Sequence, residues 1–448
     1  MFRRLHLIAS CSVPLKKEAA ELACLEAQKG NDVANFNAGV ALLRSVSNYK
    51  DPHSLLNSSW PSNQEKKNAG ETQRLENELK GYKNNLIKES IRMGNEDLGS
   101  HYYKIGDLAS ALKAFSRMRD YCTTSAHIAS TAFRIIAVAI EQKNWLGVQS
   151  QVVKIRNLQM KPEEQTRTQP KVAAAMGLQQ MCSGDYRDAA ISFLATDPTL
   201  GDSYNEFITS NDVAVYGGLC ALASMSRGEL QARVLDNPSF RNFLELEPHI
   251  RRAVSYFCAS KYSQCLEILE RYKPDYLLDL YLQPHVSEIY KKVRTKAIVQ
   301  YFQPFSKVTL SSMEKMFAVN PAVITNGTAN GNSGTTAASL ALREELIAMI
   351  QAGKLDARID LESNTLVANT TEPRADMQRA ALETTDRFIQ EAQLKLIRIN
   401  ATQAGLEIKT EKKKQPAWAT GAEGWGDELY AASGQLAGGS GRALRSGR

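Results

Sequence analysis

The amino-acid sequence predicts a mainly α-helical protein, in which a tetratricopeptide-like array of helical pairs precedes a winged helix and a C-terminal helix. Three observations support this fold class. A helix–turn–helix pattern recurs about every forty residues, which is the period of stacked helical pairs. Two later helical segments are followed by two short alternating segments, the element order of a winged helix. The last helical segment carries a heptad-like apolar stripe.

Each copy of the repeat combines a tight turn with a small residue and a large apolar residue in the second helix. Its turns are Gly106-Asp107, Lys143-Asn144, Gly184-Asp185 and Ser260-Lys261. In the clearest copy, Ala111 lets two helices approach and Phe115 fills the groove beside it. We expect Asp107, and likewise Asp185, to cap the following helix by accepting free backbone N–H groups. Such arrays mostly bind other proteins.

Changes in composition divide the chain into five predicted regions. They are a short helical N-terminal region with a polar loop (1–70), the helical-repeat array (71–290), the winged helix (291–372), a C-terminal bundle helix (373–405) and a disordered tail (406–448). An insert rich in Asn and Gly, residues 320–338, lies inside the winged helix. The polar loop, 57–63, should precede one long helix that carries Leu75, Leu79, Tyr82, Leu86, Ile87 and Ile91.

Two helices and a hairpin predict the winged helix. Ser311 and Glu314 fit a capping box that opens a short helix over 313–317. The second helix stops at Gly353 and carries an apolar face of Leu342, Leu346, Met349 and Ile350. Residues 355–361 and 365–368 alternate apolar and polar side chains, which is typical of a β-hairpin. We expect the hairpin edge to bind a neighbouring protein through Ala357, Ile359, Leu366 and Val367.

Thr371 and Pro373 open the last helix. Its stripe alternates steps of three and four residues and consists of Leu382, Thr385, Ile389, Ala392, Leu396 and Ile399. An isolated helix is stable in water mainly through packing of its apolar face. We therefore predict that partners in a helical bundle bind Leu382, Ile389, Leu396 and Ile399. The alternative is that this helix folds back on its own winged helix.

Composition indicates an ordinary globular protein of 448 residues with a modest net charge of +7. Basic and acidic residues are mixed, so charge gives only weak support for nucleic-acid binding. The seven cysteines form no Cys-x-x-Cys pair and are interpreted as small buried side chains in a reducing compartment. No apolar run approaches the ~18 residues of a membrane span. Lys16, Lys17 and Glu18 interrupt the apolar start, which favours an ordinary first helix over a signal sequence.

The sequence contains no recognisable catalytic set. Its six histidines are not spaced as metal ligands on one helix face, and no glycine-rich phosphate loop follows a strand. Cys122 and His127 lie in one helix–turn region without a third orienting group, so we interpret them as structural residues. We therefore expect no enzymatic activity, no cofactor and no metal.

A helical-pair array that runs into a winged helix is the architecture of PCI-domain proteins. Within that family, several segments of this chain resemble subunit 1 of the COP9 signalosome. They are 87–92, 97–99, 106–108, 119–122, 211–222 (NDVAVYGGLCAL), 243–248, 277–282, 284–286 and 300–302. The resemblance covers roughly residues 84–368. The short N-terminal region, the insert and the tail depart from it.

The resemblance implies a non-catalytic scaffold subunit that supports cullin deneddylation and the regulation of cullin-RING ubiquitin ligases, in cytoplasm and nucleus. It implies that other signalosome subunits bind the winged-helix edge and the C-terminal helix, that cullin-RING ligases are further partners, and that another subunit carries the metallopeptidase. One alternative is the homologous subunit of the proteasome lid. The other, from a different class, is a winged-helix nucleic-acid binder, which would need basic groups around Arg343.

Overall fold

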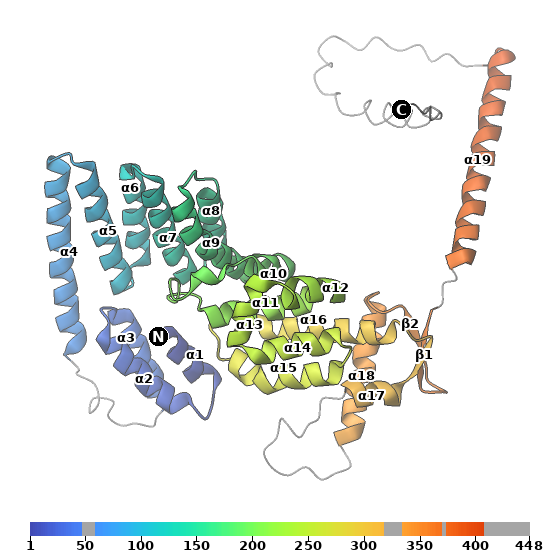
Figure 1. Ribbon diagram of the computed structural model, residues 1–448, viewed down its shortest axis with the longest axis horizontal. Coiled ribbons are helices and arrows are strands. Elements are labelled where there is room, and N and C mark those ends of the chain that lie inside the picture. Colours follow the sequence, from blue (N-terminus) through green and yellow to red (C-terminus); the bar gives the residue numbers. More distant parts are fainter. Residues whose placement is uncertain (47–58, 318–333, 370–372, 407–448) are drawn as a thin grey trace, which may run out of the picture. The chain divides into compact units, whose positions relative to one another are not determined.

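The computed structural model describes residues 1–46, 59–317, 334–369 and 373–406. The chain divides into two compact units, one formed by residues 1–369 and one that starts at residue 370. The predicted fold class is confirmed, since helical pairs lead into a winged helix in the first unit (Figure 1). The described part of the second unit is the single helix α19 (Pro373–Gln403) and the residues directly after it.

Three helices open the first unit and pack on one another. They are α1 (Phe2–Cys11), α2 (Lys16–Lys29) and α3 (Val33–Val46). Small side chains dominate their shared core, which contains Ala9, Ala19, Ala20, Cys24, Ala27, Phe36 and Leu43. This core is separate from the apolar clusters of the remaining helices. We call α1–α3 the N-terminal module.

The array follows as consecutive helices that lie side by side (Figure 1). Its longer helices are α4 (Trp60–Asn84), α5 (Lys88–Ile105), α6 (Leu108–Met118), α7 (Ser125–Glu141), α8 (Trp145–Arg156), α9 (Pro162–Cys182), α10 (Tyr186–Leu194), α11 (Ser210–Ser224), α13 (Pro238–Leu246), α14 (Pro248–Cys258), α15 (Tyr262–Tyr276) and α16 (Gln283–Phe302). Shorter helical turns are η2 (Arg119–Tyr121), η3 (Pro198–Leu200), α12 (Arg227–Leu230) and η4 (Gln231–Leu235).

The four predicted repeat turns share one backbone conformation. Gly106, Lys143, Gly184 and Ser260 have positive φ angles of 87°, 56°, 88° and 61°. In each turn the next N–H group donates to the carbonyl five residues earlier, as Asp107 does to Tyr102 at 3.0 Å. This is the Schellman arrangement that ends a helix. The four sequence copies are therefore four copies of one helix–turn–helix structure.

One of the two predicted caps is present. Asp107 accepts a hydrogen bond from the Ser110 N–H at 3.0 Å, which confirms its capping role at α6. The prediction for Asp185 is wrong, because its side chain accepts no such bond from α10. There the backbone bonds of the turn hold the chain, with Asp185 N–H donating to the Gln180 carbonyl at 3.0 Å.

Two predictions around α4 are corrected. The polar loop does not extend to residue 63, because α4 begins at Trp60, where Pro61 fits the first turn of a helix. The long helix predicted to carry Ile91 instead ends at Asn84, and Leu86 adopts a φ of 56° before α5 begins. The apolar spacing continued across this break because both helices supply one cluster, formed by Leu75, Leu79, Ile91 and Leu98.

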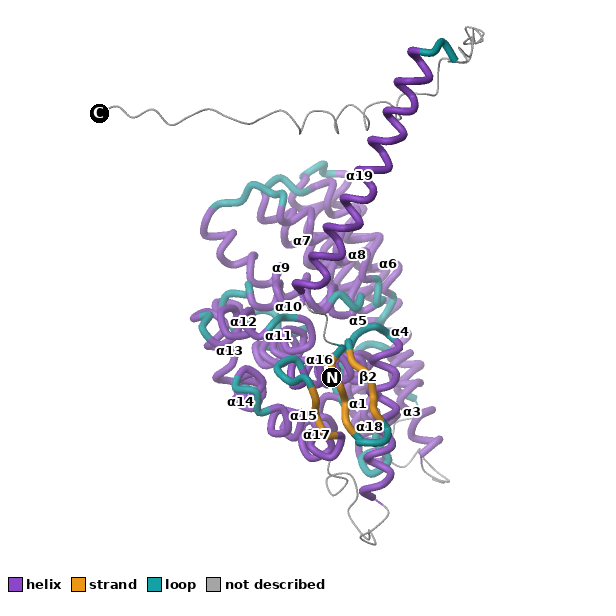
Figure 2. Tube along the Cα trace, turned by 90° about the vertical axis from the view of Figure 1, so that its right-hand side faces the viewer, coloured by secondary structure: helices purple, strands orange, loops and turns teal. Residues whose placement is uncertain are grey.

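The winged helix contains a strand that the sequence did not predict. Its elements are β1 (Lys307–Thr309), α17 (Leu310–Phe317), α18 (Gly334–Gln351), β2 (Ala357–Asp360) and β3 (Thr365–Ala368). The antiparallel sheet has the order β1-β3-β2 (strands in orange in Figure 2). Because α17 begins at Leu310, Ser311 lies inside the helix, and the capping box predicted there is wrong.

Two predicted region boundaries lie inside helices, and two predicted segments lie largely outside the described residues. The boundaries after residues 70 and 290 fall inside α4 and α16. Of the predicted insert, residues 334–338 belong to α18, and the remainder lies outside the described residues. The predicted disordered tail also lies outside them, apart from Leu406.

One apolar core connects the array with the winged helix. It runs without interruption from Ala132 in α7 to Leu366 in β3. Helix α16 links the two ends, because Val286 and Ile289 at its start and Ile298 and Phe302 at its end all belong to this core. The array therefore holds the sheet in a defined orientation within the first unit.

Candidate protein-interaction surfaces

The sheet offers a different edge from the one predicted. Strand β3 pairs with β1 on one side and with β2 on the other, so it is the central strand. Leu366 is fully buried and Val367 is 9% exposed, which excludes both as edge residues. Ala357 is also buried, and Ile359 is partly buried against the core. The free edge beside the predicted hairpin is therefore the outer side of β2.

The hydrogen bonds of the sheet show which N–H group of β2 faces that free edge. The Ala368 N–H donates to the Ser306 carbonyl at 2.9 Å, away from its pairing partner Ala357. Inward and outward groups alternate along an antiparallel pair. Ile359 lies two residues after Ala357 and pairs with Leu366, so its N–H also points outward. Among the described residues, the Ile359 N–H thus has no strand partner at this edge.

Helix α18 does not have the character of a DNA-recognition helix. Arg343 is its only basic residue. The Arg343 guanidinium donates to Asn364 Oδ1 at 3.3 Å, which ties α18 to the β2–β3 turn. Glu345, two residues further along α18, forms an ion pair with Arg294 of α16 at 2.8 Å. These side chains hold the domain together, and a helix that reads bases needs several free cations.

Helix α19 carries large apolar side chains on its surface. All four predicted binding residues of its stripe, Leu382, Ile389, Leu396 and Ile399, are exposed. At 100° per residue, these four side chains fall on one side of the helix. The opposite side carries Glu383, Arg387 and Arg398. The structure thus places the predicted stripe on one amphipathic helix, and the binding of a partner to it stays a prediction.

Two exposed residues of this face were missed by the sequence analysis. Met377 and Phe388 are 72% and 71% exposed. Met377, Phe388 and Ile399 are spaced by eleven residues, which is close to three helical turns, so they align along the helix. The heptad pattern hid them, but an eleven-residue spacing could have identified them. The apolar face of α19 is therefore wider than the seam of a coiled coil, which uses two positions, a and d, of each heptad.

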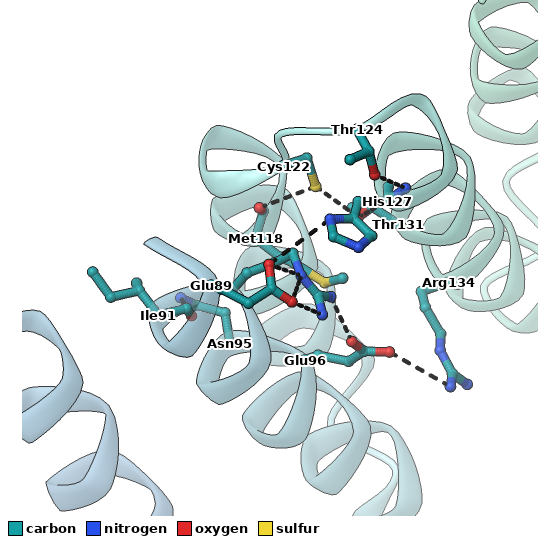
Figure 3. A network of polar contacts seen from close by, with 11 residues as sticks. Glu89, Ile91, Asn95, Glu96, Met118, Cys122, Thr124, His127, Thr131 and Arg134 are labelled. Atoms are coloured by element: carbon teal, nitrogen blue, oxygen red, sulfur yellow. Dashed lines mark hydrogen bonds and ion pairs between the residues drawn. The ribbon is translucent and has the colours of Figure 1, made fainter. Parts of the chain in front are cut away.

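The Cys122 and His127 pair lies in a structural network rather than in a catalytic arrangement (Figure 3). Cys122 Sγ donates to the Met118 carbonyl at 3.4 Å and lies 3.2 Å from Thr131 Oγ1. His127 Nδ1 instead faces Glu89 at 3.8 Å. The thiol and the imidazole thus have different neighbours, and no oriented nucleophile–base pair results.

The same network connects neighbouring helices of the array. Arg92 is largely buried and donates to Glu89 at 3.0 Å and to Glu96 at 2.8 Å, both on α5. Glu96 also lies 3.9 Å from Arg134 of α7 (Figure 3). Hydrogen bonds to Arg92 hold the pKa of Glu89 below its usual range. These charges join α5 to α7.

Residues from the segments that resemble signalosome subunit 1 meet inside the array. The hydroxyl of the buried Tyr216 donates to both oxygens of Asp279, at 2.8 and 2.9 Å. Asp279 also accepts from the N–H groups of Tyr281 and Leu282. These contacts connect α11 to the start of α16. Two of these segments, 211–222 and 277–282, therefore meet in one contact inside the array.

Within the described part of the chain, His, Cys, Asp and Glu side chains do not gather in threes that could hold a metal ion. None of the helices in the described ranges combines the length and apolar character that crossing a bilayer requires.

Comparison with known proteins identifies two matching family models. The model for 26S proteasome subunit RPN7 matches residues 57–233, and the PCI domain model matches residues 269–370. COP9 signalosome complex subunit 1 of Emericella nidulans is 55% identical over 408 residues, which cover 91% of this chain and 80% of the relative. The subunit 1 protein of Neurospora crassa is 39% identical over 414 residues, covering 92% and 89%.

The proteasome alternative receives less support. The 26S proteasome non-ATPase regulatory subunit 6 of Caenorhabditis elegans is 22% identical over 329 residues, covering 72% of this chain and 75% of the relative. The signalosome relatives share more residues over a longer part of the chain. The predicted resemblance is confirmed at this level.

Proposed function

The chain belongs to the family of COP9 signalosome subunit 1, and we propose that it serves as a non-catalytic scaffold subunit of that complex. The relatives that carry this name cover most of the chain. Array, winged helix and C-terminal helix together provide surfaces for binding other proteins. Other signalosome subunits are the partners that follow from this assignment.

The exposed apolar face of α19 is the observation that carries the proposal. Along this helix Leu382, Phe388, Ile389, Leu396 and Ile399 are all exposed. Fully burying one such side chain contributes ~1.5–3 kcal/mol, so several together could anchor a subunit in a helical bundle. Proteins rarely leave so many large apolar residues exposed along one element unless something covers them.

Replacing Ile389 and Leu396 together by Asp tests this face. The bundle hypothesis predicts a chain with unchanged thermal unfolding that no longer co-purifies with the other signalosome subunits, because two charges now interrupt the apolar face. The measurement is affinity purification of the tagged chain, with mass spectrometry of the co-purifying subunits and a thermal-unfolding curve.

Leu394→Asp is the matched control. Leu394 is 67% exposed and Leu396 60%, but Leu394 lies on the opposite side of the helix. The control variant should co-purify normally. A double variant that still assembles would contradict the proposal. A double variant whose thermal unfolding is destabilised would favour the alternative in which α19 folds back on its own winged helix.

The edge of β2 is the second proposed contact. We propose that a strand of a neighbouring subunit pairs with it, because the outward N–H of Ile359 needs an acceptor and a partner strand supplies a series of them. Each hydrogen bond nets only ~0.5–1.5 kcal/mol, so side-chain burial must add to them.

We propose further that the assembled complex acts on cullin-RING ligases, in cytoplasm and nucleus, and that another subunit supplies the catalytic metal. The isolated chain should then show no deneddylase activity. Removing it from cells should raise the modified fraction of cullins, measured by immunoblotting. Activity of the purified chain that zinc chelation abolishes would contradict this proposal.

A further inference from the structure

The N-terminal module contacts the array mainly through polar groups. Arg3 forms an ion pair with the Glu141 carboxylate of α7 and donates to the Glu141 carbonyl at 3.1 Å. Arg4 lies 3.8 Å from Asp212 of α11. The Gln283 side-chain amide donates to Cys11 Sγ at 3.2 Å. Among the described residues, the array packs on the apolar core of the module through Trp60, whose ring lies 4.8 Å from that of Phe36.

The space between the module and the array is incompletely filled. A cleft of about 540 Å³, open to solvent, lies there, with Arg3 and Arg4 on the module side and Tyr103, Glu141, Glu206 and Asp212 on the array side. The module thus contacts the array through a few charged groups beside a solvent-filled cleft, and it has a core of its own.

The array side of this contact is acidic. Burial raises the pKa of both the Glu141 and the Asp212 carboxyl, and the arginine beside each opposes that shift. Glu206, to which the Tyr103 hydroxyl donates at 3.3 Å, adds a third negative charge. Among the described residues, the cations paired with Glu141 and Asp212 both come from α1. Half-buried carboxylates are stabilised by such a cation.

The arginines themselves remain accessible. The side chains of Arg3 and Arg4 are 41% and 49% exposed. Ion pairs of this exposure are weak and are screened by salt. Because α1 is covalently attached to the array, its effective concentration at these carboxylates is high, and this favours the contact although each ion pair is weak. A separate basic helix could make the same contacts.

We propose that the array surface formed by Glu141, Glu206 and Asp212 is a docking site for a basic helix of a partner protein, and that α1 occupies it as an intramolecular competitor. The partner helix must present two neighbouring arginines, as α1 does with Arg3 and Arg4. This inference is independent of which complex the chain joins, because it concerns only the contact between the N-terminal module and the array.

Carboxyl footprinting of the full chain tests the first half of the proposal. In the variant Arg3→Glu/Arg4→Glu, repulsion from the three carboxylates should release α1. Labelling of Glu141 and Asp212 by carbodiimide and glycinamide, measured by mass spectrometry, should then rise about tenfold, as expected for local opening. Labelling of the exposed Glu267 in α15 should stay constant. High salt should produce the same rise in the unmodified chain.

Arg44→Glu is the matched control, because it makes the same type of charge change on the exposed side of α3. It should leave the labelling of Glu141 and Asp212 unchanged. Unchanged labelling in the Arg3→Glu/Arg4→Glu variant would overturn the proposal, and so would an equal rise in the control.

A synthetic peptide of residues 1–29, which contains α1 and α2, tests the second half. Fluorescence anisotropy should detect its binding to the Arg3→Glu/Arg4→Glu chain, and binding to the unmodified chain should be at least about tenfold weaker because α1 already occupies the site. A peptide with both arginines replaced by glutamate should bind neither chain. Equal binding of the two peptides, or no binding to the variant chain, would overturn the docking site.

Discussion

Inside the repeats, the sizes of two paired side chains vary in opposite directions. Seven residues before the turn, the first helices carry Gly99, Ile136, Gly177 and Ala253. Nine residues after the turn, the second helices carry Phe115, Val152, Phe193 and Leu269. Glycine is matched with phenylalanine, whereas larger residues are matched with smaller aliphatic ones. The repeats therefore conserve volume rather than residue type, which is what close packing demands.

Replacing Gly99 by Ala should destabilise the protein by about 1–3 kcal/mol, because overpacking a core costs that much. A β-carbon at Gly99 would lie 2.6 Å from Phe115 Cε1. Gly70→Ala, in the middle of α4 and with no atom of the described residues within 4 Å of the added carbon, is the control and should stabilise by roughly 0.5–1 kcal/mol. Urea unfolding measures both, and equal effects of the two variants would contradict the packing argument.

His249 makes the stability of the protein depend on pH. Its ring stacks on Tyr272, with 3.9 Å between centroids, and Nε2 lies 2.6 Å from the Tyr276 hydroxyl. Burial lowers the pKa of His249, although the nearby Glu247 and Asp275 oppose the shift. The native state therefore binds this proton less readily than the unfolded chain does. The free energy of unfolding must fall as pH decreases below the unfolded value of ~6.5.

A His249→Gln variant should lose less stability than the unmodified chain between pH 7.5 and pH 5, since it no longer has that titrating group. Thermal unfolding at a series of pH values provides the comparison. Parallel pH profiles for the two chains would contradict a lowered pKa of His249. His285, whose pKa burial also lowers, should contribute a second part of the same pH dependence.

At the scale of elements, the four repeat turns use the left-handed conformation with different residues. Glycine adopts positive φ at no steric cost, but Lys143 and Ser260 adopt it with a β-carbon. The tertiary packing of the flanking helices determines the turn even where the local residue is unfavourable.

Lys143→Gly should therefore stabilise the protein by about 0.5–1 kcal/mol. The strain energy relieved at positive φ in the folded state is larger than the cost of the extra conformational entropy that glycine gives the unfolded chain. Lys113→Gly, at an exposed position with ordinary helical backbone in α6, is the control and should destabilise by about 1 kcal/mol. Calorimetry distinguishes the two signs. A destabilised Lys143→Gly chain would show that the lysine side chain supports the turn.

The elements that could be predicted from the sequence are those whose signal is local. The repeat turns, the cap at Asp107 and the face of α18 depend on residues close together in the chain. Strand β1 could not be predicted, because its three residues become a strand only through pairing with Thr365–Val367. The break between α4 and α5 was hidden for a similar reason, since Ile91 reaches the same cluster from a second helix.

The candidate site was predictable in part for the same reason. The α19 stripe lies on one helix, so its spacing predicts its face, although the heptad pattern omits Met377 and Phe388. The free sheet edge depends on strand order, which local alternation does not contain. The local pattern places Leu366 and Val367 in a hairpin, but it does not show that the distant β1 pairs with the other side of their strand.

At the scale of the whole molecule, strand order decides which substitution tests assembly. The Ile359→Pro variant removes the outward N–H and should weaken co-purification with neighbouring subunits. The control is Ile359→Ala, which loses similar packing but keeps the N–H. Thermal unfolding of the proline variant should change no more than that of the control. Val367→Pro, on the central strand, should instead destabilise the chain itself. Normal assembly of the Ile359→Pro chain would exclude this edge as a contact.

The single apolar core from Ala132 to Leu366 links assembly to the lifetime of the subunit. Because the repeats from α7 onward and the sheet share it, they should melt together, and a partner bound to one end should raise the melting temperature of the other. A ligand at a hundred times its dissociation constant adds about 2.7 kcal/mol to the unfolding free energy. An unassembled chain lacks that gain throughout this shared core and is more often open to proteases. Cellular abundance of the subunit would then follow the supply of its partners.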